Sequence, residues 1–553
     1  MSMPDYNLLD EPWIPVFLDD GTIEKLGIKA IFERSKQIVD LACELPTQKI
    51  AVQRMLLAIC YRVIAVRDAE EWERVWEEGL PTGNILEYLD RWRDRFFLFG
   101  GLFPFMQVHD LRTEKGTVSG LEKIIVDVPN GKPFFTTRHG RAIASISPDE
   151  AAIWLLHAHA YDPSGIRSGA LGDSDIKEGK GFPIGPAWCG QTGTVWLRGE
   201  KLNETLVLNL IPHDFGYLRG PSPDSSASAC TWEAEEPETA HRRDYSIDGK
   251  PEPSGIGIPR LLTWHSRRVR LYGDRSGVTG VLLAQGDKLG PQNMHLCEPL
   301  SLWRYSLPQS KKHKVETYMP RKHEPGRAFW RSLPSILPSS DTVDGLTKQP
   351  QQRFLRSATL QFHSRYTATP GRYPMRLKIE AIGMDYRSKE TVVNDIYHDE
   401  MILPSVLLKE SSEHLVGLVD RQLRATEELA QAVGFLAANL ARAAGEDGDG
   451  AGDGSRDRAR ELFFARIDNP FRQWVSALGT HSTLITEETK WRKIARQIAW
   501  KVASSLIEGV ASSAIRGRKT NRGYISSAIA ENYFNAALNK IMPVCDQMKG
   551  GAQ

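Results

Sequence analysis

The sequence predicts an α+β protein with a large mixed domain over residues 1–400 and a C-terminal four-helix bundle over residues 401–553. Two observations lead to this prediction. Glycines, prolines and short β-prone runs are frequent between residues 100 and 400, as is typical of mixed folds with long loops. From Val406 onwards, apolar residues recur at helical spacing instead.

The first hundred residues predict a short strand and two helices. Residues 7–16 (NLLDEPWIPV) mix apolar residues with prolines, which indicates a short strand or extended arm. A helix is expected from Gln48, with Thr47 as its N-cap. A second helix is expected over residues 85–97, where apolar residues form one stripe that indicates core packing.

The middle of the chain predicts strands and loops. Arg267, Arg268 and Arg270 alternate along one β-prone run, which predicts a basic, exposed strand face. Residues 221–238 are polar and rich in turn formers, so a surface loop is expected there. The β-prone runs are residues 194–197, 205–211, 268–272 and 278–283.

The C-terminal part predicts helices separated by a glycine-rich linker. Residues 445–455 (GEDGDGAGDGS) have the composition of a flexible linker. Helical patterns precede it from residue 415 and resume at residues 458–464, 471–478, 491–507 and 525–541.

Composition restricts the class of protein. The 553 residues carry a formal net charge of +1, so nucleic-acid binding would require local basic patches or partner subunits. The six cysteines form no CxxC pair, which predicts free thiols, no zinc site and no other cofactor. The N-terminus does not have the pattern of a signal peptide, and no apolar run is long enough to span a bilayer. A cytoplasmic protein is expected.

Catalytic motifs are weak. Three His-Asp dipeptides, at His109, His213 and His398, suggest an HD-type metal-dependent nuclease, but no further ligands surround them at helical spacing. His157 and His159 are two positions apart in a helical run, so they point in different directions and are expected to be structural. Neither a GxxxxGK[ST] loop nor a GxSxG elbow is present. A protein without enzymatic activity is the leading hypothesis, and the nuclease is the alternative.

Basic residues gather near the C-terminus. Residues 456–549 contain 16 Lys and Arg against 8 Asp and Glu. Such a patch suits a phosphate backbone, but it is also what a solvated face looks like, and the sequence leaves both open. One cluster lies at the start of a predicted helix and comprises Lys490, Arg492, Lys493 and Arg496. The other lies between two predicted helices and comprises Arg516, Arg518, Lys519 and Arg522.

Four segments in order resemble the CRISPR type I-E Cascade large subunit, the CasA family. They are the opening residues 7–16, Pro104 to Gln107 (PFMQ), Leu206 to Asn209 (LVLN) and Gly383 to Arg387 (GMDYR). The resemblance implies a mixed N-terminal domain and a C-terminal four-helix bundle. It also implies a non-catalytic subunit of a crRNA-guided complex, with the other Cascade subunits and crRNA as partners.

The role implied by the resemblance is DNA recognition. The subunit would read the protospacer-adjacent motif of a double-stranded target from the minor groove, promote strand separation and R-loop formation, and recruit the helicase–nuclease. The minor groove presents a degenerate hydrogen-bonding pattern, so a loose motif preference is expected.

The resemblance also implies site residues. The glycine loop corresponds to residues 164–168, and its lysine finger falls near Lys288. Phe134 and Phe135 are stacking candidates in the segment that contacts the end of the crRNA, residues 130–141, which begins at Asn130. The motif-reading residues are Gly165, Ile166 and Arg167 of the glycine loop, Lys288, and Ser388, Lys389, Glu390 and Thr391 of the wedge.

This sequence departs from the family pattern in two places. Glu390 occupies a position where glutamine is typical, and a carboxylate at a duplex fork repels phosphates. Either Lys389 compensates or the wedge acts sterically. Some members carry a cysteine-rich zinc knot, but residues 273–281 contain no cysteine, so no metal is expected.

Overall fold

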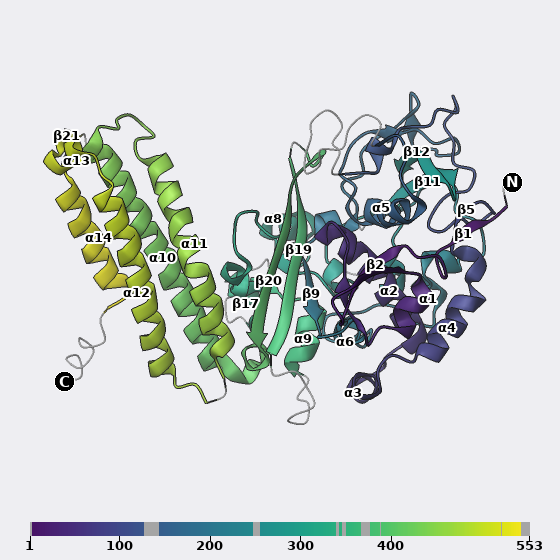
Figure 1. Ribbon diagram of the computed structural model, residues 1–553, viewed down its shortest axis with the longest axis horizontal. Helices are drawn as coiled ribbons and strands as arrows, with labels where there is room; N and C mark the ends of the chain where they lie inside the picture. The colour runs from purple at the N-terminus through teal and green to yellow at the C-terminus, as the bar shows by residue number, and fades with distance from the viewer. Residues whose placement is uncertain are drawn as a thin grey trace. The chain divides into compact units, whose positions relative to one another are not determined.

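The computed structural model describes residues 3–126, 143–246, 255–338, 342–344, 350–365, 376–387, 389–479, 481–520 and 523–543. The chain divides into two compact units. The first comprises residues 1–329, 339–370 and 377–400, and the second comprises residues 330–338, 371–376 and 401–553. The first unit mixes helices with strands and the second is mainly helical, so the predicted α+β fold class is confirmed (Figure 1).

Helix α2 forms the centre of the first unit, with every side chain from Thr47 to Tyr61 buried. It packs against α5 and α7. The helices of this unit are α1 (Ile28–Glu33), α2 (Pro46–Ile64), α3 (Ala69–Glu78), α4 (Thr82–Arg91), α5 (Pro148–Tyr161), α6 (Leu202–Asn209), α7 (Ile258–Leu262), α8 (Leu307–His313) and α9 (Ala358–Arg365).

The start of α2 differs from the prediction. Leu45, not Thr47, is the N-cap, and its backbone N–H donates to the side-chain oxygen of Gln48. Pro46 explains the earlier start, because its fixed φ suits the first position of a helix. The Thr47 hydroxyl lies 3.0 Å from Nε2 of His157 and joins α2 to α5. His157 and His159 are both buried, as expected of structural histidines.

The strands of the first unit form small sheets. Three-stranded sheets have the orders β3-β2-β4, β20-β19-β9, β15-β14-β18 and β6-β8-β7, and the pairs are β1-β5, β10-β13, β11-β12 and β16-β17. The strands are β1 (Asp5–Asn7), β2 (Ile14–Leu18), β3 (Ile23–Leu26), β4 (Ile38–Leu41), β5 (Phe97–Phe99), β6 (Arg167–Ser168), β7 (Ile176–Lys177), β8 (Lys180–Gly181), β9 (Thr194–Arg198), β10 (Asp244–Tyr245), β11 (Arg267–Asp274), β12 (Gly277–Gln285), β13 (Lys288–Leu289), β14 (Trp303–Tyr305), β15 (Tyr318–Pro320), β16 (Thr342–Asp344), β17 (Pro350–Gln352), β18 (Phe354–Leu355), β19 (Arg376–Arg387) and β20 (Val392–Pro404).

Three of the four β-prone runs are strands: β9, β11 and β12. The prediction for residues 205–211 is wrong, because Thr205 to Asn209 belong to helix α6. Most side chains of α6 are buried, so its apolar run has no polar face, and periodicity cannot separate a helix from a strand. The helix predicted over residues 85–97 is shorter, since α4 ends at Arg91 and Phe97 begins β5.

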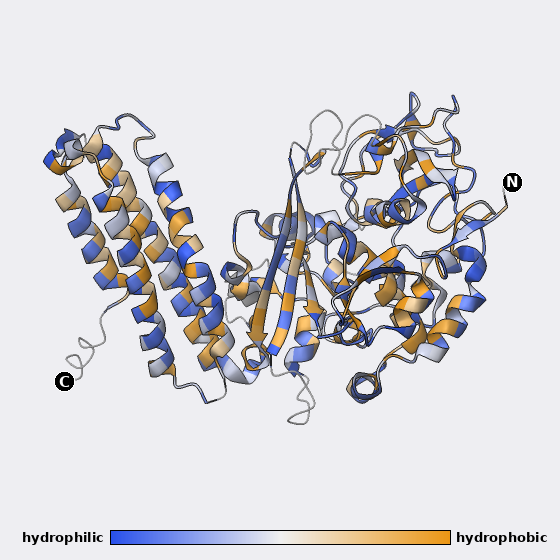
Figure 2. Ribbon diagram, in the orientation of Figure 1, coloured by the Kyte–Doolittle hydropathy of each residue, from blue (hydrophilic) through white to orange (hydrophobic). Residues whose placement is uncertain are grey.

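In the second unit, α10 packs against α11, α12 and α14. Trp491 lies in the core, where its ring stacks on Trp474 at 5.1 Å and its Nε1 donates to the Thr426 hydroxyl at 3.1 Å. Figure 2 shows hydrophobic and hydrophilic residues alternating along these helices, as amphipathic packing requires. The elements are α10 (Glu413–Ala444), α11 (Asp453–Ala477), α12 (Leu484–Glu508), α13 (Ser512–Arg516), β21 (Arg518–Thr520), β22 (Gly523–Ile525) and α14 (Ser527–Ile541).

Helix α11 joins two predicted helical segments into one. It begins at Asp453, so the last three residues of the predicted linker are helical, and it continues through Pro470. Proline removes one backbone hydrogen bond. Burial of Ile467 and Phe471 on either side keeps the helix continuous.

Two further observations concern the described part of the chain. No helix there combines the length and apolarity needed to span a membrane. The described cysteines, Cys43, Cys60, Cys189, Cys230 and Cys297, are free thiols, as predicted, and Cys545 lies outside the described residues.

Candidate nucleic-acid interface

Two consecutive buried arginines on β11 support the two loops expected to meet DNA. Arg267 and Arg268 are each 1% exposed, so the prediction of an exposed basic strand face is wrong for them. Successive residues of a strand point to opposite faces. Arg267 pairs with Asp162, and Arg268 pairs with Asp287. These carboxylates stand just before Gly165 and Lys288, respectively.

Asp162 anchors the start of the glycine loop. Its Oδ2 accepts from Nε of Arg267 at 2.5 Å and from Nη2 of Arg167 at 2.7 Å. Arg267 also donates to the backbone oxygens of Pro163 and Gly185. Burial lowers the pKa of the Arg267 guanidinium, and the Asp162 carboxylate opposes that shift. A buried charge with full pairing of this kind holds its neighbours in one arrangement.

Gly165 occupies a backbone conformation that suits glycine, with φ at +152°. A Cβ atom there would lie 3.0 Å from Nη1 of Arg167 and would press on the arginine that holds Asp162. The Gly165 carbonyl accepts from Nε2 of Gln285 at 2.8 Å. Arg167 is therefore a support of the loop, while Ile166 between them is 55% exposed.

Lys288 follows a tightly packed turn. A Cβ atom on Gly286 would lie 2.3 Å from the backbone oxygen of His265, so only glycine fits this approach to β11. Asp287 then receives hydrogen bonds from Arg268 and from the backbone N–H of Arg243. The Lys288 side chain is 42% exposed, and its Nζ lies 3.1 Å from Oδ2 of Asp244.

The predicted wedge lies at the tip of the hairpin formed by β19 and β20. Lys389 and Glu390 both have left-handed backbone conformations, with φ at 58° and 62°. Such a conformation costs about 1 kcal/mol or more for a residue with a side chain. The Thr391 N–H donates to the Arg387 oxygen at 3.1 Å, and the Ser164 N–H donates to the Glu390 oxygen at 2.8 Å. The structure therefore brings the wedge and the glycine loop together.

Lys322 neutralises the carboxylate at this tip. Its Nζ lies 2.7 Å from Oε1 of Glu390 and 5.5 Å from the centre of the Tyr386 ring. Tyr386 donates its hydroxyl to the Tyr161 oxygen at 2.7 Å, and burial raises its pKa well above 10. The sequence left Lys389 as the candidate for compensating Glu390, but in the structure Glu390 pairs with Lys322.

Several predicted site residues lie outside the described part of the chain. They are Ser388 of the wedge, Arg522 of the basic cluster, and the crRNA-contacting residues Asn130, Phe134 and Phe135.

The basic cluster near the C-terminus divides into two kinds of residue. Arg518 binds the α10–α11 connection, donating to the Gly445 oxygen at 2.8 Å and to Asp447 at 2.7 Å. Arg516 and Lys519 are exposed, and no carboxylate pairs with either of them within the described residues. These two side chains are available to a polyanion.

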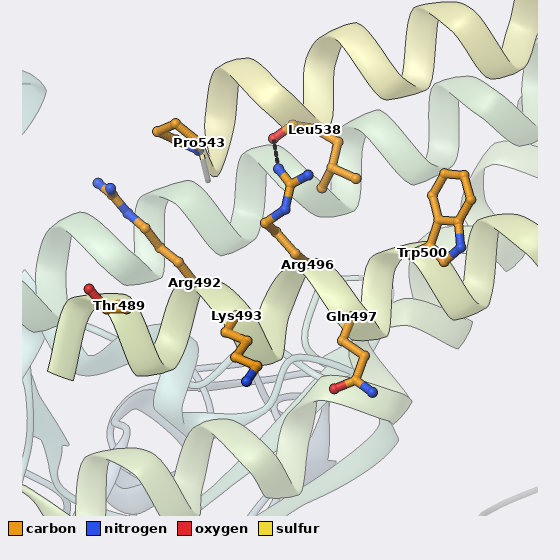
Figure 3. Close-up of a pocket in the computed structure, with 8 residues that line it drawn as sticks. All are labelled: Thr489, Arg492, Lys493, Arg496, Gln497, Trp500, Leu538 and Pro543. Carbon is orange, nitrogen blue, oxygen red and sulfur yellow. Dashed lines mark hydrogen bonds between the residues drawn. The ribbon is translucent and has the colours of Figure 1, made fainter. Parts of the chain in front are cut away.

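The cluster on α12 lines a groove of about 560 Å³ beside α14. Arg492 pairs with Glu488 at 2.5 Å. Arg496 reaches across to α14 and donates to the Leu538 oxygen at 3.2 Å, while Lys493 points away from α14 (Figure 3). Trp500, which is 45% exposed, forms one end of the groove. Arg496 therefore joins α12 to α14, whereas the Arg492–Glu488 pair lies within α12.

The His-Asp dipeptides do not assemble an HD-type site in the described residues. Asp399 accepts from the backbone N–H of Phe329 at 2.7 Å, instead of joining His398. Within the described residues, one group has metal-ligand spacing, namely Glu380, His398 and Glu400. Glu380 is already paired with Lys49 and with Nε2 of His398, so a basic side chain occupies the position next to the carboxylate.

Sequence reasoning missed the residues that position the loops. Asp162, Asp287 and Gln285 support the glycine and lysine loops, and Lys322 pairs with the wedge. The one usable indication was the run of basic residues inside an apolar strand, since arginines there need buried acidic partners.

Comparison with known proteins identifies the family. The family model for CRISPR-associated protein Cse1 matches residues 7–502. A CRISPR-associated protein CasA/Cse1 from Thermus thermophilus is 27% identical over 450 residues, covering 80% of this chain and 79% of that protein.

Solved structures agree. Cse1 from Thermobifida fusca is 35% identical, with a TM-score of 0.86, and 98% of each chain is covered. A chain of a CRISPR RNA-guided surveillance complex is 17% identical, with a TM-score of 0.66, covering 98% of this chain and 100% of that chain, and shares the fold. The chain therefore belongs to the CRISPR-associated Cse1 (CasA) family of non-catalytic Cascade large subunits.

Proposed function

We propose that this chain recognises the protospacer-adjacent motif of double-stranded DNA within a crRNA-guided surveillance complex. It starts strand separation at the motif, so that R-loop formation can proceed, and recruits the helicase–nuclease that degrades the target. The remaining Cascade subunits and the crRNA are its partners. A similar chain occurs in a CRISPR RNA-guided surveillance complex, which supports this assignment.

One observation carries the proposal. The Ser164 N–H donates to the Glu390 oxygen at 2.8 Å, so the glycine loop and the hairpin tip lie side by side. A small loop residue allows backbone to approach a narrow groove, and the hairpin tip beside it would part the strands. Strand exchange with RNA is nearly balanced in free energy, so help at the first base pairs is where a protein contributes most.

The charges fit this role. The Lys288 side chain is partly exposed, and it follows Asp287, which pairs with Arg268 next to the arginine that anchors the glycine loop. Lys322 offsets the charge of the Glu390 carboxylate. In the second unit, Arg516 and Lys519, which pair with no carboxylate in the described part of the chain, would supply positive charge for a phosphate backbone.

The test is reconstitution of the complex with crRNA and the other subunits. The substrate is a library of duplexes that share one target sequence and carry randomised flanking bases. We expect the bound fraction to be enriched in a short flanking motif and permanganate to detect unpaired thymines next to it. Equal capture of all flanks would refute motif recognition.

Two alternatives predict different results. An HD-type metal-dependent nuclease would cleave DNA without the other Cascade subunits when manganese or nickel is present. Membership in a non-catalytic family argues against this alternative. A scaffold without nucleic-acid contact would leave motif discrimination intact when Lys288 is replaced.

A further inference from the structure

One exposed apolar side chain lies in the glycine loop, and a second lies at the end of the neighbouring strand β8. Ile166 is 55% exposed and Phe182 is 47% exposed. Arg167 of β6 pairs with Gly181 of β8, so Ile166 and Phe182 stand at the next positions of the two antiparallel strands. Opposed residues of antiparallel strands point to the same face. The two side chains thus form an apolar tip next to Gly165.

This tip has a built support. Nε2 of Gln285 donates to the Gly165 oxygen at 2.8 Å and to the Gly181 oxygen at 3.3 Å, so one side chain holds both strand ends. Arg167, the first residue of β6, is held by Asp162. The fold therefore fixes the backbone of the tip while leaving its apolar side chains in solvent, where they contribute little to folding.

The charges around the tip favour an anionic partner. Lys177 and Lys180, on β7 and β8, are exposed, and no carboxylate pairs with either of them in the described residues. Lys389 lies at the neighbouring hairpin tip, and Glu178 is the one acid in the β7–β8 turn. Exposed apolar side chains close to lysines in the same small sheet are also found in proteins that press such residues between base pairs from the minor groove.

We propose that Ile166 and Phe182 pack against the first base pairs beside the recognised motif and weaken their stacking. This inference rests on the proposed function and adds a second duplex-opening element to the hairpin wedge. The nucleic acid is bound by Gly165 and Lys288, and the apolar tip acts on the base pairs that must open first.

The experiment measures capture of a motif-bearing duplex by the reconstituted complex. The variants are Phe182→Ala and Ile166→Ala, and the matched control is Leu171→Ala, which removes a side chain that is 49% exposed in the same segment. Each substrate is tested fully paired and with mismatches in the base pairs beside the motif. We expect roughly tenfold weaker capture of the paired duplex by each variant, because the contact that weakens stacking of the first base pairs is lost and opening them costs more free energy. On the mismatched duplex, capture should return to that of the unmodified complex.

Three outcomes overturn the inference. One is capture by Phe182→Ala that equals capture by Leu171→Ala. Another is an equal defect on paired and mismatched duplexes, which would mean that the tip contributes binding but no opening. The third is loss of subunits from the Phe182→Ala complex in native mass spectrometry, which would assign the tip to a protein contact. If the unmodified complex fails to prefer motif-bearing DNA, the proposed function itself fails, so the two failures are distinguishable.

Discussion

Lys322 lies 2.7 Å from Glu390 and gives the carboxylate at the hairpin tip its charge partner. Both side chains are partly exposed, at 36% and 46% respectively. The pair explains how an acid can occupy the hairpin tip that we propose lies next to DNA phosphates. Substitutions of Lys322 and Glu390 can therefore test the charge of the predicted wedge separately from its shape.

Replacing Lys322 by alanine should therefore weaken DNA capture. The freed Glu390 carboxylate would repel phosphates, and we expect about fivefold weaker binding, in the range of partly exposed charge pairs. The double variant Lys322→Ala with Glu390→Gln should restore binding, because no uncompensated charge remains. Fluorescence anisotropy with the reconstituted complex measures both, and a double variant as weak as the single one would show that Lys322 contacts DNA itself.

Replacing Lys288 by alanine should reduce capture of motif-bearing duplexes roughly tenfold, as expected for loss of a charged hydrogen bond. Binding of motif-free DNA should change little. Lys378→Ala is the matched control, because Lys378 is 44% exposed and paired with Glu200 at 2.7 Å, much as Lys288 is 42% exposed and paired with Asp244. A Lys288 variant that discriminates as well as the control would remove this residue from the site.

The basic residues of the second unit should affect salt dependence. Arg516→Ala combined with Lys519→Ala should lower the slope of log K against log salt by about 2, at about 0.9 per phosphate contact. Arg518→Ala should change the slope less, since its guanidinium binds Gly445 and Asp447. Titrations between low and physiological salt measure the slopes, and an unchanged slope in the double variant would mean that this patch is only solvated.

Removing Asp162 should destabilise the first unit strongly. Asp162→Ala leaves Arg267 buried without its charge partner, and the free energy of unfolding should fall by about 3–5 kcal/mol. The comparison is Asp244→Ala, because the Asp244 carboxylate is 57% exposed and pairs only at the surface with Lys288. Chemical denaturation followed by circular dichroism measures both, and similar midpoints would mean that water or a neighbour replaces the lost carboxylate.

The free energy of unfolding should fall as the pH is lowered, because His157 is buried. Burial lowers the pKa of His157 to about 3, whereas an unfolded histidine titrates near 6.5. The unfolded state therefore binds the extra proton first as the pH falls, and the stabilisation present above pH 6.5 is lost progressively towards pH 3. Between pH 7 and pH 5, His157 should account for about 2 kcal/mol of lost stability.

His157→Gln tests this, because an amide can keep the contact with Thr47 without titrating. Its unfolding free energy should depend less on pH than that of the unmodified protein. Urea unfolding at pH 7 and pH 5 supplies the numbers, and equal pH dependence in His157→Gln and the unmodified protein would contradict the argument.

The fold was predictable where the spacing or type of apolar residues is characteristic of a helix or a strand. The long helices of the second unit follow from the helical spacing of their apolar residues, and strands β9, β11 and β12 follow from short β-prone runs. Helix α6 was not predictable in this way, since its run from Thr205 to Asn209 is buried throughout. The sequence around Pro470 likewise did not indicate that helix α11 would continue through this proline.

The candidate site was less accessible to sequence reasoning. The resemblance placed Gly165, Lys288 and Glu390, but their supports come from distant parts of the chain. Arg267 and Asp162 are 105 positions apart, and Lys322 and Glu390 are 68 apart. The basic run inside an apolar strand indicates that acidic partners exist, but their identity as Asp162 and Asp287 could not be read from the strand alone.

Because Arg267 and Arg268 share one peptide bond, the anchors of the glycine loop and of Lys288 are mechanically linked. A force that displaces Asp162 pulls on the same short stretch of β11 that holds Asp287. Binding of the glycine loop in a DNA groove would thus also fix the position of Lys288. The two DNA contacts would then form cooperatively and not independently.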